Sequence, residues 1–202
     1  MMIKNTQRGF TLLEVLVAIS IFVMIVVGIT SMMIYAFHNN KVIWEQLSTQ
    51  NEGRKVSQDL VNELRTASAS SIGAYTLEKA EIQQLVFYSN IDTDSWRERV
   101  RYFKDGTNLK KGITKPTGNP LTYNPANENI TTIAHDVANG VNPLFYYYNQ
   151  VYTGVEVPLV QPVAVTAVRM IKFSIDLDIN PNTSPVPLHI ETMVAVRNLK
   201  SN

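Results

Sequence analysis

Apolar residues fill the first part of the chain almost without interruption from Gly9 to Tyr35. Between Glu14 and Lys41 stand 26 residues that carry no formal charge. As a helix rising about 1.5 Å per residue, they would extend for about 39 Å. The hydrocarbon core of a bilayer is only about 30 Å thick. The pattern therefore predicts a membrane-spanning helix over residues 10–37, with length to spare for tilt.

Helical spacing continues beyond this run while the composition becomes polar. Val56, Leu60 and Leu64 recur at four-residue intervals, as on one face of an amphipathic helix. No proline interrupts this stretch. We therefore expect one long helix whose second, amphipathic part covers residues 38–71. Gly53 lies inside this part and is a candidate for a bend or break.

From residue 72 onward, short stretches with alternating apolar and polar residues indicate β-strands. Strands are predicted at residues 84–89, 97–104, 108–113, 145–148, 166–179 and 188–197. Asp105-Gly106 is a hairpin turn signal, and the last two strands are expected to pair antiparallel. Residues 115–129 and 181–187 are rich in turn formers and are predicted as connections. The fold class is therefore α+β, with a long N-terminal helix packed against an antiparallel β domain of residues 72–202.

Glu14 is an acid inside the apolar run. A charge in a membrane segment is unfavourable, by up to about 3 kcal/mol near the centre, and is a functional hypothesis by default. A cleaved secretory signal would explain the basic residues Lys4 and Arg8, but the run is far longer than such signals use. The small-residue pair that cleavage would need, Ala18 and Ser20, lies in the middle of the run. An ordinary single-pass anchor, with Glu14 near the interface, is the second simple alternative.

The residues Gly9-Phe10-Thr11-Leu12-Leu13-Glu14 follow a short basic leader and precede a long apolar run. This arrangement resembles the class III signal of type IV pilins and pseudopilins. The resemblance implies a leader of residues 1–9, cut by a prepilin peptidase between Gly9 and Phe10, and N-methylation of Phe10. It also implies that Glu14 pairs with the amino terminus of a neighbouring subunit. Such a partner would bring the opposite charge and hydrogen bonds that a buried carboxylate requires.

A looser resemblance covers most of residues 84–199. It rests on Phe87-Tyr88, Arg99-Val100-Arg101-Tyr102, Phe145-Tyr146-Tyr147 and Val196-Arg197-Asn198-Leu199. These are similar to a branch of minor pilins that contains the type II secretion minor pseudopilin J and the pilus minor pilin W. The resemblance implies a structural subunit that joins other minor pilins and the major pilin in a tip complex. A type IV pilus minor pilin is preferred to a secretion pseudopilin.

The amino-acid composition narrows the class of protein further. The chain of 202 residues has no cysteine, which excludes disulfides, thiolate metal sites and cysteine nucleophiles. Many major pilins close a C-terminal loop with a disulfide, so this absence favours a minor component. Lys4 and Arg8 precede the span, and no Lys or Arg follows it before Lys41, which predicts a cytoplasmic amino terminus and an extracytoplasmic β domain. The net charge of +1 gives no global reason to expect nucleic-acid binding.

No catalytic or cofactor-binding motif is recognised in the sequence. Asp92-Thr93-Asp94 resembles the start of a calcium loop, but Arg97 and Phe103 occupy the positions of its glycine and its last acid. A solvated turn is therefore predicted, and no metal or cofactor is expected. The histidines are dispersed and are expected to face solvent or to pack: His38, His135 and His189. An enzyme on a membrane stalk is a remote alternative to a structural subunit.

One group of positive residues lies on the predicted hairpin: Arg97, Arg99, Arg101, Lys104, Lys110 and Lys111. Charge of this kind commonly protects a sheet from edge-to-edge aggregation. The alternative is a singly anchored surface module that grips the acids of a partner, or DNA. The run Tyr146-Tyr147-Tyr148 is expected to be core and amphipathic edge rather than a ligand platform.

Overall fold

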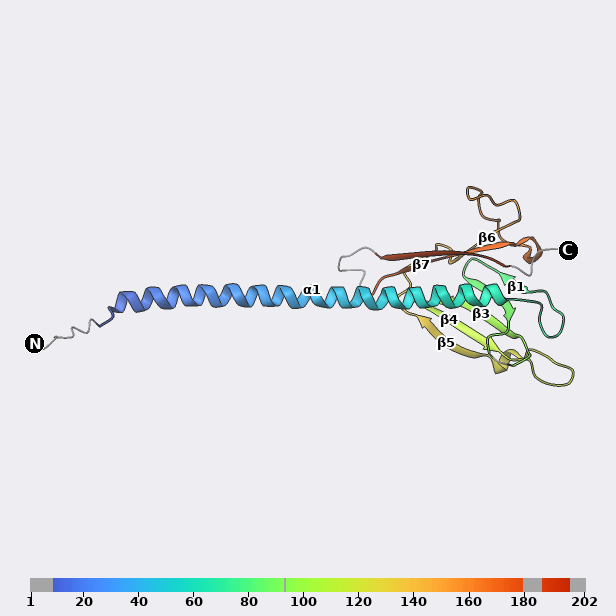
Figure 1. Ribbon diagram of the computed structural model, residues 1–202, viewed down its shortest axis with the longest axis horizontal. Coiled ribbons are helices and arrows are strands. Elements are labelled where there is room, and N and C mark those ends of the chain that lie inside the picture. Colours follow the sequence, from blue (N-terminus) through green and yellow to red (C-terminus); the bar gives the residue numbers. More distant parts are fainter. Residues whose placement is uncertain (1–8, 93, 180–186, 197–202) are drawn as a thin grey trace, which may run out of the picture. The chain divides into compact units, whose positions relative to one another are not determined.

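The computed structural model describes residues 9–92, 94–179 and 187–196 (Figure 1). Most of the predicted leader and of the connection predicted at 181–187 lies outside the described residues. The chain divides into two compact units, residues 1–45 and 46–202. The predicted α+β class is confirmed, because one long helix is followed by antiparallel strands.

The first unit contains the apolar part of helix α1 (Leu12–Thr66), a continuous helix of 55 residues. By length and composition, α1 is able to cross a membrane. The hydroxyl groups in its apolar part are hydrogen-bonded within the helix. Those of Ser20, Thr30 and Ser31 donate to backbone carbonyl oxygens of the preceding turn, at 2.8, 2.8 and 2.9 Å respectively. This pairing suits a hydrocarbon environment, where water is not available as a partner.

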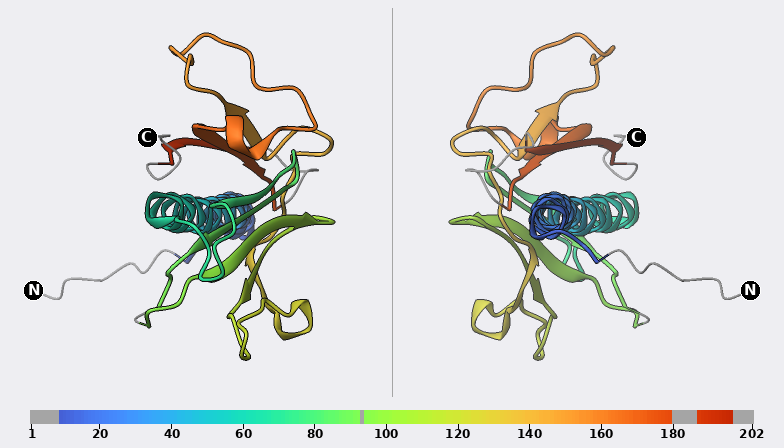
Figure 2. Two further views of the ribbon diagram at one scale, coloured as in Figure 1. Left: turned by 90° about the vertical axis from the view of Figure 1, so that its right-hand side faces the viewer. Right: turned by 90° about the vertical axis from the view of Figure 1, so that its left-hand side faces the viewer.

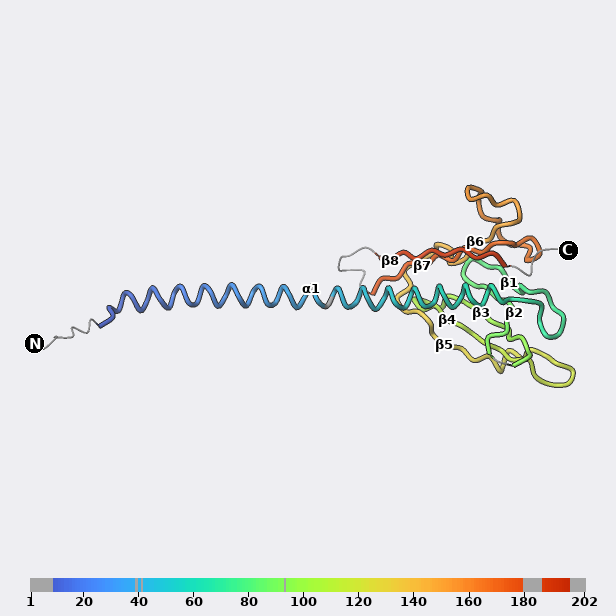
Figure 3. The backbone as a smooth tube through the Cα atoms, viewed as in Figure 1, coloured from blue at the N-terminus to red at the C-terminus, as the bar shows by residue number. Residues whose placement is uncertain are grey.

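The second unit contains two antiparallel sheets, whose strands are all labelled in Figure 3. The five-stranded sheet has the order β1 (Leu77–Ala80), β2 (Gln84–Ser89), β3 (Glu98–Asp105), β4 (Asn108–Thr114) and β5 (Asn129–Ala134). The three-stranded sheet has the order β6 (Phe145–Tyr148), β7 (Met170–Leu177) and β8 (Leu188–Ala195). Short 3-10 helices are η1 (Pro125–Asn127) and η2 (Val165–Ala167).

Most predicted strands are confirmed, with corrections at their ends. Strands β2, β4 and β6 match the predicted ranges closely, and β7 pairs antiparallel with β8 as expected. Strand β7 is shorter than predicted, because η2 occupies its predicted start and the strand ends at Leu177. Strands β1 and β5 were not predicted. The side chains of β5 are mostly exposed at the edge of the sheet, so its sequence lacks the alternation of a half-buried strand.

Helix α1 ends at Thr66, five residues before the predicted end at residue 71. The chain joins the five-stranded sheet at this point, because the amide of Ser68 donates to the carbonyl of Tyr88 at 3.0 Å. This bond requires an extended backbone and is incompatible with another helical turn. The expected single long helix is confirmed, and the break considered at Gly53 does not occur.

In the second unit, the end of α1 lies between the two sheets (Figure 2). Its apolar stripe joins one core cluster with residues of both sheets: Val56, Leu60, Leu64, Leu85, Tyr102, Phe173 and Val194. Gly53 permits a close approach. A Cβ atom at this position would lie 2.3 Å from Cδ1 of Ile190 and 2.9 Å from Cδ1 of Leu177. Gly53 is thus a packing residue against the three-stranded sheet rather than a hinge.

The variant Gly53→Leu tests this packing role. We expect a loss of about 1–3 kcal/mol of unfolding free energy from overpacking, although leucine favours a helix over glycine by about 1 kcal/mol. Urea titration of the full chain in detergent, followed by near-UV circular dichroism, measures the change. Gln58→Leu places the same side chain on an exposed helix position and is expected to be nearly neutral. Equal stability of Gly53→Leu and the parent protein would contradict the close approach.

Candidate functional site

The residues of the predicted cleavage junction lie just before the long helix. Gly9 and Phe10 are outside regular secondary structure, and the side chain of Phe10 is 86% exposed. Helix α1 starts two residues later, at Leu12. A peptidase that must reach the backbone between Gly9 and Phe10 therefore finds it unencumbered by helical hydrogen bonds.

Glu14 and Thr11 form a reciprocal cap at the start of α1. The backbone N–H of Thr11 donates to Oε2 of Glu14 at 2.9 Å, and the Thr11 hydroxyl donates to the same oxygen at 3.0 Å. In return, the backbone N–H of Glu14 donates to the Thr11 hydroxyl oxygen at 3.3 Å. This is a capping box, which satisfies two amide donors that a helix N-terminus otherwise leaves unpaired. This local role of Glu14 was not predicted from the sequence.

The cap uses only one of the two carboxylate oxygens of Glu14. Both bonds from Thr11 end on Oε2, and within the described part of the chain no hydrogen bond reaches Oε1. The cap also survives the predicted cleavage, since both of its members lie after the Gly9–Phe10 junction. The geometry therefore leaves Glu14 able to accept a further donor without losing its own helix cap.

Most positive residues of the β3–β4 hairpin form ion pairs within the domain. Arg99 makes two hydrogen bonds to the carboxylate of Glu78, both at 2.7 Å. Arg101 makes the same kind of paired contact with Glu128, at 2.8 and 2.6 Å, while its guanidinium lies 3.8 Å from the centre of the Phe103 ring. These paired contacts have the geometry in which arginine binds carboxylates best.

The lysines and the remaining arginine of this hairpin are also engaged. Lys110 pairs with Asp105 at 2.6 Å, and Lys111 pairs with Glu63 of α1. Lys104 donates to the carbonyl of Gly140 at 3.0 Å, and Arg97 donates to the hydroxyl of Ser68. Among the described residues, four of the six basic side chains seen in the sequence thus form ion pairs, whereas Lys104 and Arg97 bind neutral groups. Most of the positive charge that a DNA interface would use is therefore compensated.

Two glutamates, Glu63 of α1 and Glu78 of β1, accept hydrogen bonds from tyrosines of the five-stranded sheet. The Tyr102 hydroxyl donates to Glu63 at 2.8 Å, and the Tyr88 hydroxyl donates to Glu78 at 2.8 Å. Burial, together with the nearby charge of Glu63, raises the pKa of Tyr102 far above its usual range. Burial opposes ionisation of Glu78, but the hydrogen bonds from Arg99 and Tyr88 outweigh it, so the pKa of Glu78 is lowered. Both tyrosines therefore act as neutral hydrogen-bond donors to these glutamates.

The histidines are not brought together. His38 lies in the apolar part of α1, whereas His135 and His189 lie in the second unit. His135 contacts Glu52 at 2.8 Å, and His189 contacts Asp176 across the β7–β8 pair at 2.6 Å. The hydrogen bond to Asp176 raises the pKa of His189. Each of the two is thus paired with an acid rather than grouped with other histidines.

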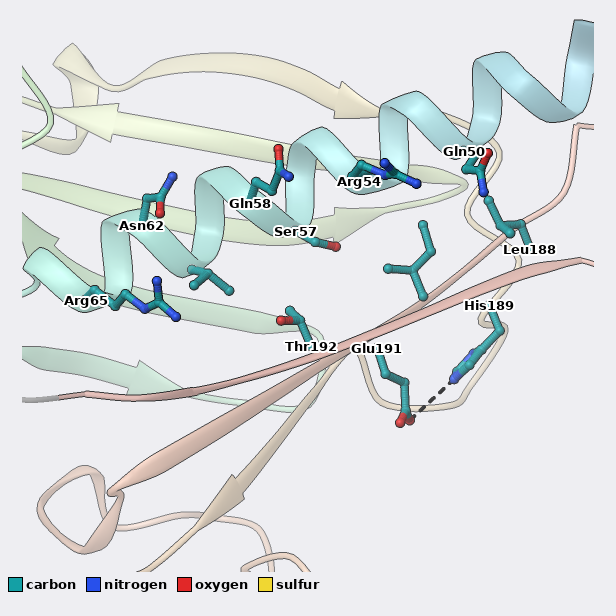
Figure 4. A pocket seen from close by; sticks show the side chains of 12 residues that line it. Gln50, Arg54, Ser57, Gln58, Asn62, Arg65, Leu188, His189, Glu191 and Thr192 are labelled. Atoms are coloured by element: carbon teal, nitrogen blue, oxygen red, sulfur yellow. Dashed lines mark ion pairs between the residues drawn. The ribbon is translucent and has the colours of Figure 1, made fainter.

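Two grooves lie beside the part of α1 in the second unit. The first, of about 540 Å³, lies between the helix and β8, with Arg54, Gln58 and Asn62 on the helix side and Thr192 on the strand side (Figure 4). The side chains of His189 and Glu191 point from β8 away from the helix, with Nε2 of His189 3.4 Å from Oε1 of Glu191. The second, of about 740 Å³, lies between the helix and strands β4 and β5. Both have mixed polar and apolar walls.

Glu98, at the start of β3, joins the two aspartates considered in the sequence and was not itself predicted. Asp92, Asp94 and Glu98 each offer a carboxylate oxygen, and these oxygens lie within 4.8 Å of one another. Glu98 is fully buried. Burial, with the neighbouring charges of Asp92 and Asp94, raises the pKa of Glu98 although backbone amides bind it. The solvated turn predicted here accounts for the two aspartates but not for Glu98.

Comparison with protein-family models matches residues 4–33 to the prokaryotic N-terminal methylation motif. The match covers 30 of the 202 residues, and it contains the Gly9–Phe10 junction, Glu14 and the first part of α1. No match was found among curated proteins. The motif and the apolar helix together support a type IV pilin-like protein that is anchored in a membrane.

The ion pair between Arg101 and Glu128 provides a test of the sheet network. Glu128→Ala removes both hydrogen bonds to Arg101 and also an approach of 3.8 Å to Arg99. We expect a loss of about 2 kcal/mol in unfolding free energy, since the side chain of Arg101 is only 21% exposed and is left without its partner.

Asp105→Ala is the matched control, because it breaks the pair with Lys110 where the Asp105 side chain is 58% exposed. Exposed pairs contribute less than about 1 kcal/mol, so this variant is expected to stay near the parent protein. Urea titration of the full chain measures both variants. A Glu128→Ala protein as stable as Asp105→Ala would show that the network adds little.

Proposed function

We propose that the chain is a minor pilin of a type IV filament system, a structural subunit that acts in the initiation of filament assembly. One observation carries the proposal. The Gly9–Phe10 junction and Glu14 stand at the start of a continuous helix that is uncharged over its next 26 residues. A helix of this kind is suited first to a bilayer and then to a bundle of like helices.

Processing by a prepilin peptidase between Gly9 and Phe10 is the first proposed step. It removes the basic leader with Lys4 and Arg8 and exposes the amine of Phe10, which is then N-methylated. The accessible, non-helical backbone at this junction supports the step. Before it, the positive leader holds the amino terminus in the cytoplasm, and the β domain lies on the other side of the cell membrane.

Pairing of Glu14 with the amine of a neighbouring subunit is the second proposed step. The unused Oε1 of Glu14 supports this pairing, since Oε2 can remain in the helix cap. In an apolar bundle the two charges neutralise each other, and neither would be stable there alone. Each subunit offers both an acid and an amine, so the contact is head-to-tail and can repeat along a filament.

Docking of the β domain on other minor pilins and on the major pilin is the third proposed step. No catalytic role is proposed. A minor pseudopilin of type II secretion is the second candidate, because the same resemblance over residues 84–199 covers it. Co-purification with pilus or with secretion components distinguishes the two. A DNA-binding module is less favoured, since the ion pairs of Arg99 and Arg101 neutralise the charges that it would use.

The variant Gly9→Ala tests the proposed processing. We expect it to retain residues 1–9, because an added Cβ at the cleavage junction is predicted to exclude it from the peptidase. Mass spectrometry of the protein purified from its own host gives the mature amino terminus. Gly28→Ala, which makes the same change inside α1, is expected to be processed normally. A chain that begins at Phe10 in the Gly9→Ala variant would contradict the prediction.

The pair Glu14→Gln and Glu14→Val separates the two roles of this residue. Glutamine can keep the helix cap but lacks the charge, whereas valine loses both. If charge pairing drives assembly, both variants should be cleaved and membrane-bound, yet should enter filaments at a tenth or less of the parent level. Immunoblots of sheared filaments measure incorporation, with the surface variant Glu81→Gln as a control. Normal incorporation of Glu14→Gln would reduce the role of Glu14 to capping.

A further inference from the structure

The loop that joins β2 to β3 gathers three carboxylates, and we infer that it binds a divalent cation, Ca²⁺ in preference to Mg²⁺. The ligands are Asp92 and Asp94 in the loop and Glu98 at the start of β3, with one oxygen of each within 4.8 Å of the others. The site lies in the second unit and is independent of the N-terminal signal, so this inference does not depend on the proposed function.

Glu98 is the observation that distinguishes this loop from an ordinary acidic turn. Its side chain is fully buried, and its Oε2 accepts a hydrogen bond from the backbone N–H of Ile91 at 3.0 Å. Its Oε1 is also buried but has no hydrogen-bond partner among the described residues. A buried carboxylate oxygen without a partner is costly, and a coordinated cation would remove that cost.

The charges of the loop are only partly balanced. Lys115 donates to Oδ2 of Asp92 and, at 3.2 Å, to Oδ2 of Asp94. When ionised, the three carboxylates carry three negative charges, against one positive charge on Lys115. With Lys115 in place the loop thus keeps an excess of negative charge, which favours the binding of a cation. Lys115 already occupies the two aspartates, so a metal ion that binds them must compete with it.

The type and number of the ligands favour calcium. All three are carboxylates, which hard cations such as Ca²⁺ and Mg²⁺ prefer. Two oxygens bound to one Ca²⁺ at about 2.3–2.6 Å lie at most about 5 Å apart, and every pair in this cluster lies within 4.8 Å. Mg²⁺ demands a near-octahedral geometry and is usually held by only one or two carboxylates, so a set of three favours Ca²⁺.

The loop differs from the helical calcium loop considered in the sequence analysis. Arg97 and Phe103 occupy the positions where that loop needs a glycine and an acid, so this loop is not of the helical type. The third acid instead comes from β3, seven positions into the count that starts at Asp92. Backbone amides brace the two aspartates: Asp94 N–H donates to Asp92 at 3.0 Å, and Trp96 N–H donates to Asp94 at 2.8 Å.

Terbium luminescence tests the site directly, because Trp96 lies within the loop and its excitation can be transferred to a bound Tb³⁺ ion. The full chain in detergent, stripped with a chelator, is titrated with Tb³⁺ and then with Ca²⁺ or Mg²⁺ as competitor. We expect saturable emission that Ca²⁺ displaces at a concentration at least about tenfold lower than Mg²⁺. Calorimetric titration with Ca²⁺ alone gives the affinity without the probe.

Variants of the loop identify the ligands. Asp94→Asn, at an exposed position, is expected to weaken Ca²⁺ binding at least about tenfold without affecting the fold. Lys115→Gln is expected to strengthen it several-fold, because the competing cation is gone. Asp105→Asn and Lys110→Gln alter an equivalent ion pair at the other end of the hairpin and should leave binding unchanged. Trp96→Phe should lose the emission but keep the calorimetric signal.

The inference is overturned if Ca²⁺ produces no saturable binding in either measurement. It is equally overturned if Asp94→Asn binds as the parent protein does, since the ion would then lie elsewhere. If Lys115→Gln binds Ca²⁺ more weakly than the parent protein, the acids serve as structural ion-pair partners of Lys115 and not as metal ligands. Circular dichroism of each variant confirms that the fold is intact.

Discussion

The burial of the apolar stripe on α1 is the interaction on which the β part of this protein depends. Val56, Leu60 and Leu64 belong to a core cluster that includes residues of both sheets. Each sheet has an apolar face that must be covered, and here the same helix covers both. At Gly53, the absence of a side chain leaves room for Ile190 and Leu177. The polar network of the five-stranded sheet is built on this arrangement, since Glu63 of the helix binds Tyr102 and Lys111.

Much of this fold follows from residue spacing alone. The long helix, the strand at residues 84–89 and the antiparallel pairing of β7 with β8 were all predicted, because each element keeps a regular apolar period. The end of the helix and the edge strands β1 and β5 were not predicted. Strand β5 has a mostly exposed surface, and α1 ends where Ser68 binds Tyr88, a contact that no local pattern reveals. Elements whose position depends on tertiary contacts cannot be predicted from the period of apolar residues alone.

The candidate sites divide in the same way. Gly9, Phe10 and Glu14 could be proposed from the sequence because their signal is contiguous, whereas the capping box of Thr11 with Glu14 was equally local but was not predicted. The ion pairs of the sheet were beyond sequence reasoning. Arg99 and Arg101 meet partners 21 and 27 residues away, so their positive charge appeared free until the sheet was seen. Glu98 likewise reads as part of a polar stretch and shows its burial only in the fold.

The half-used carboxylate of Glu14 has a consequence for quality control. Before cleavage, the nitrogen of Phe10 is a neutral amide joined to Gly9. After cleavage, it is a cation at the tip of the helix. In the proposed pairing, an unprocessed precursor thus presents an acid but no complementary charge to its neighbours. Cleavage of the one peptide bond between Gly9 and Phe10 would then distinguish processed from unprocessed subunits, without a separate protein that checks them.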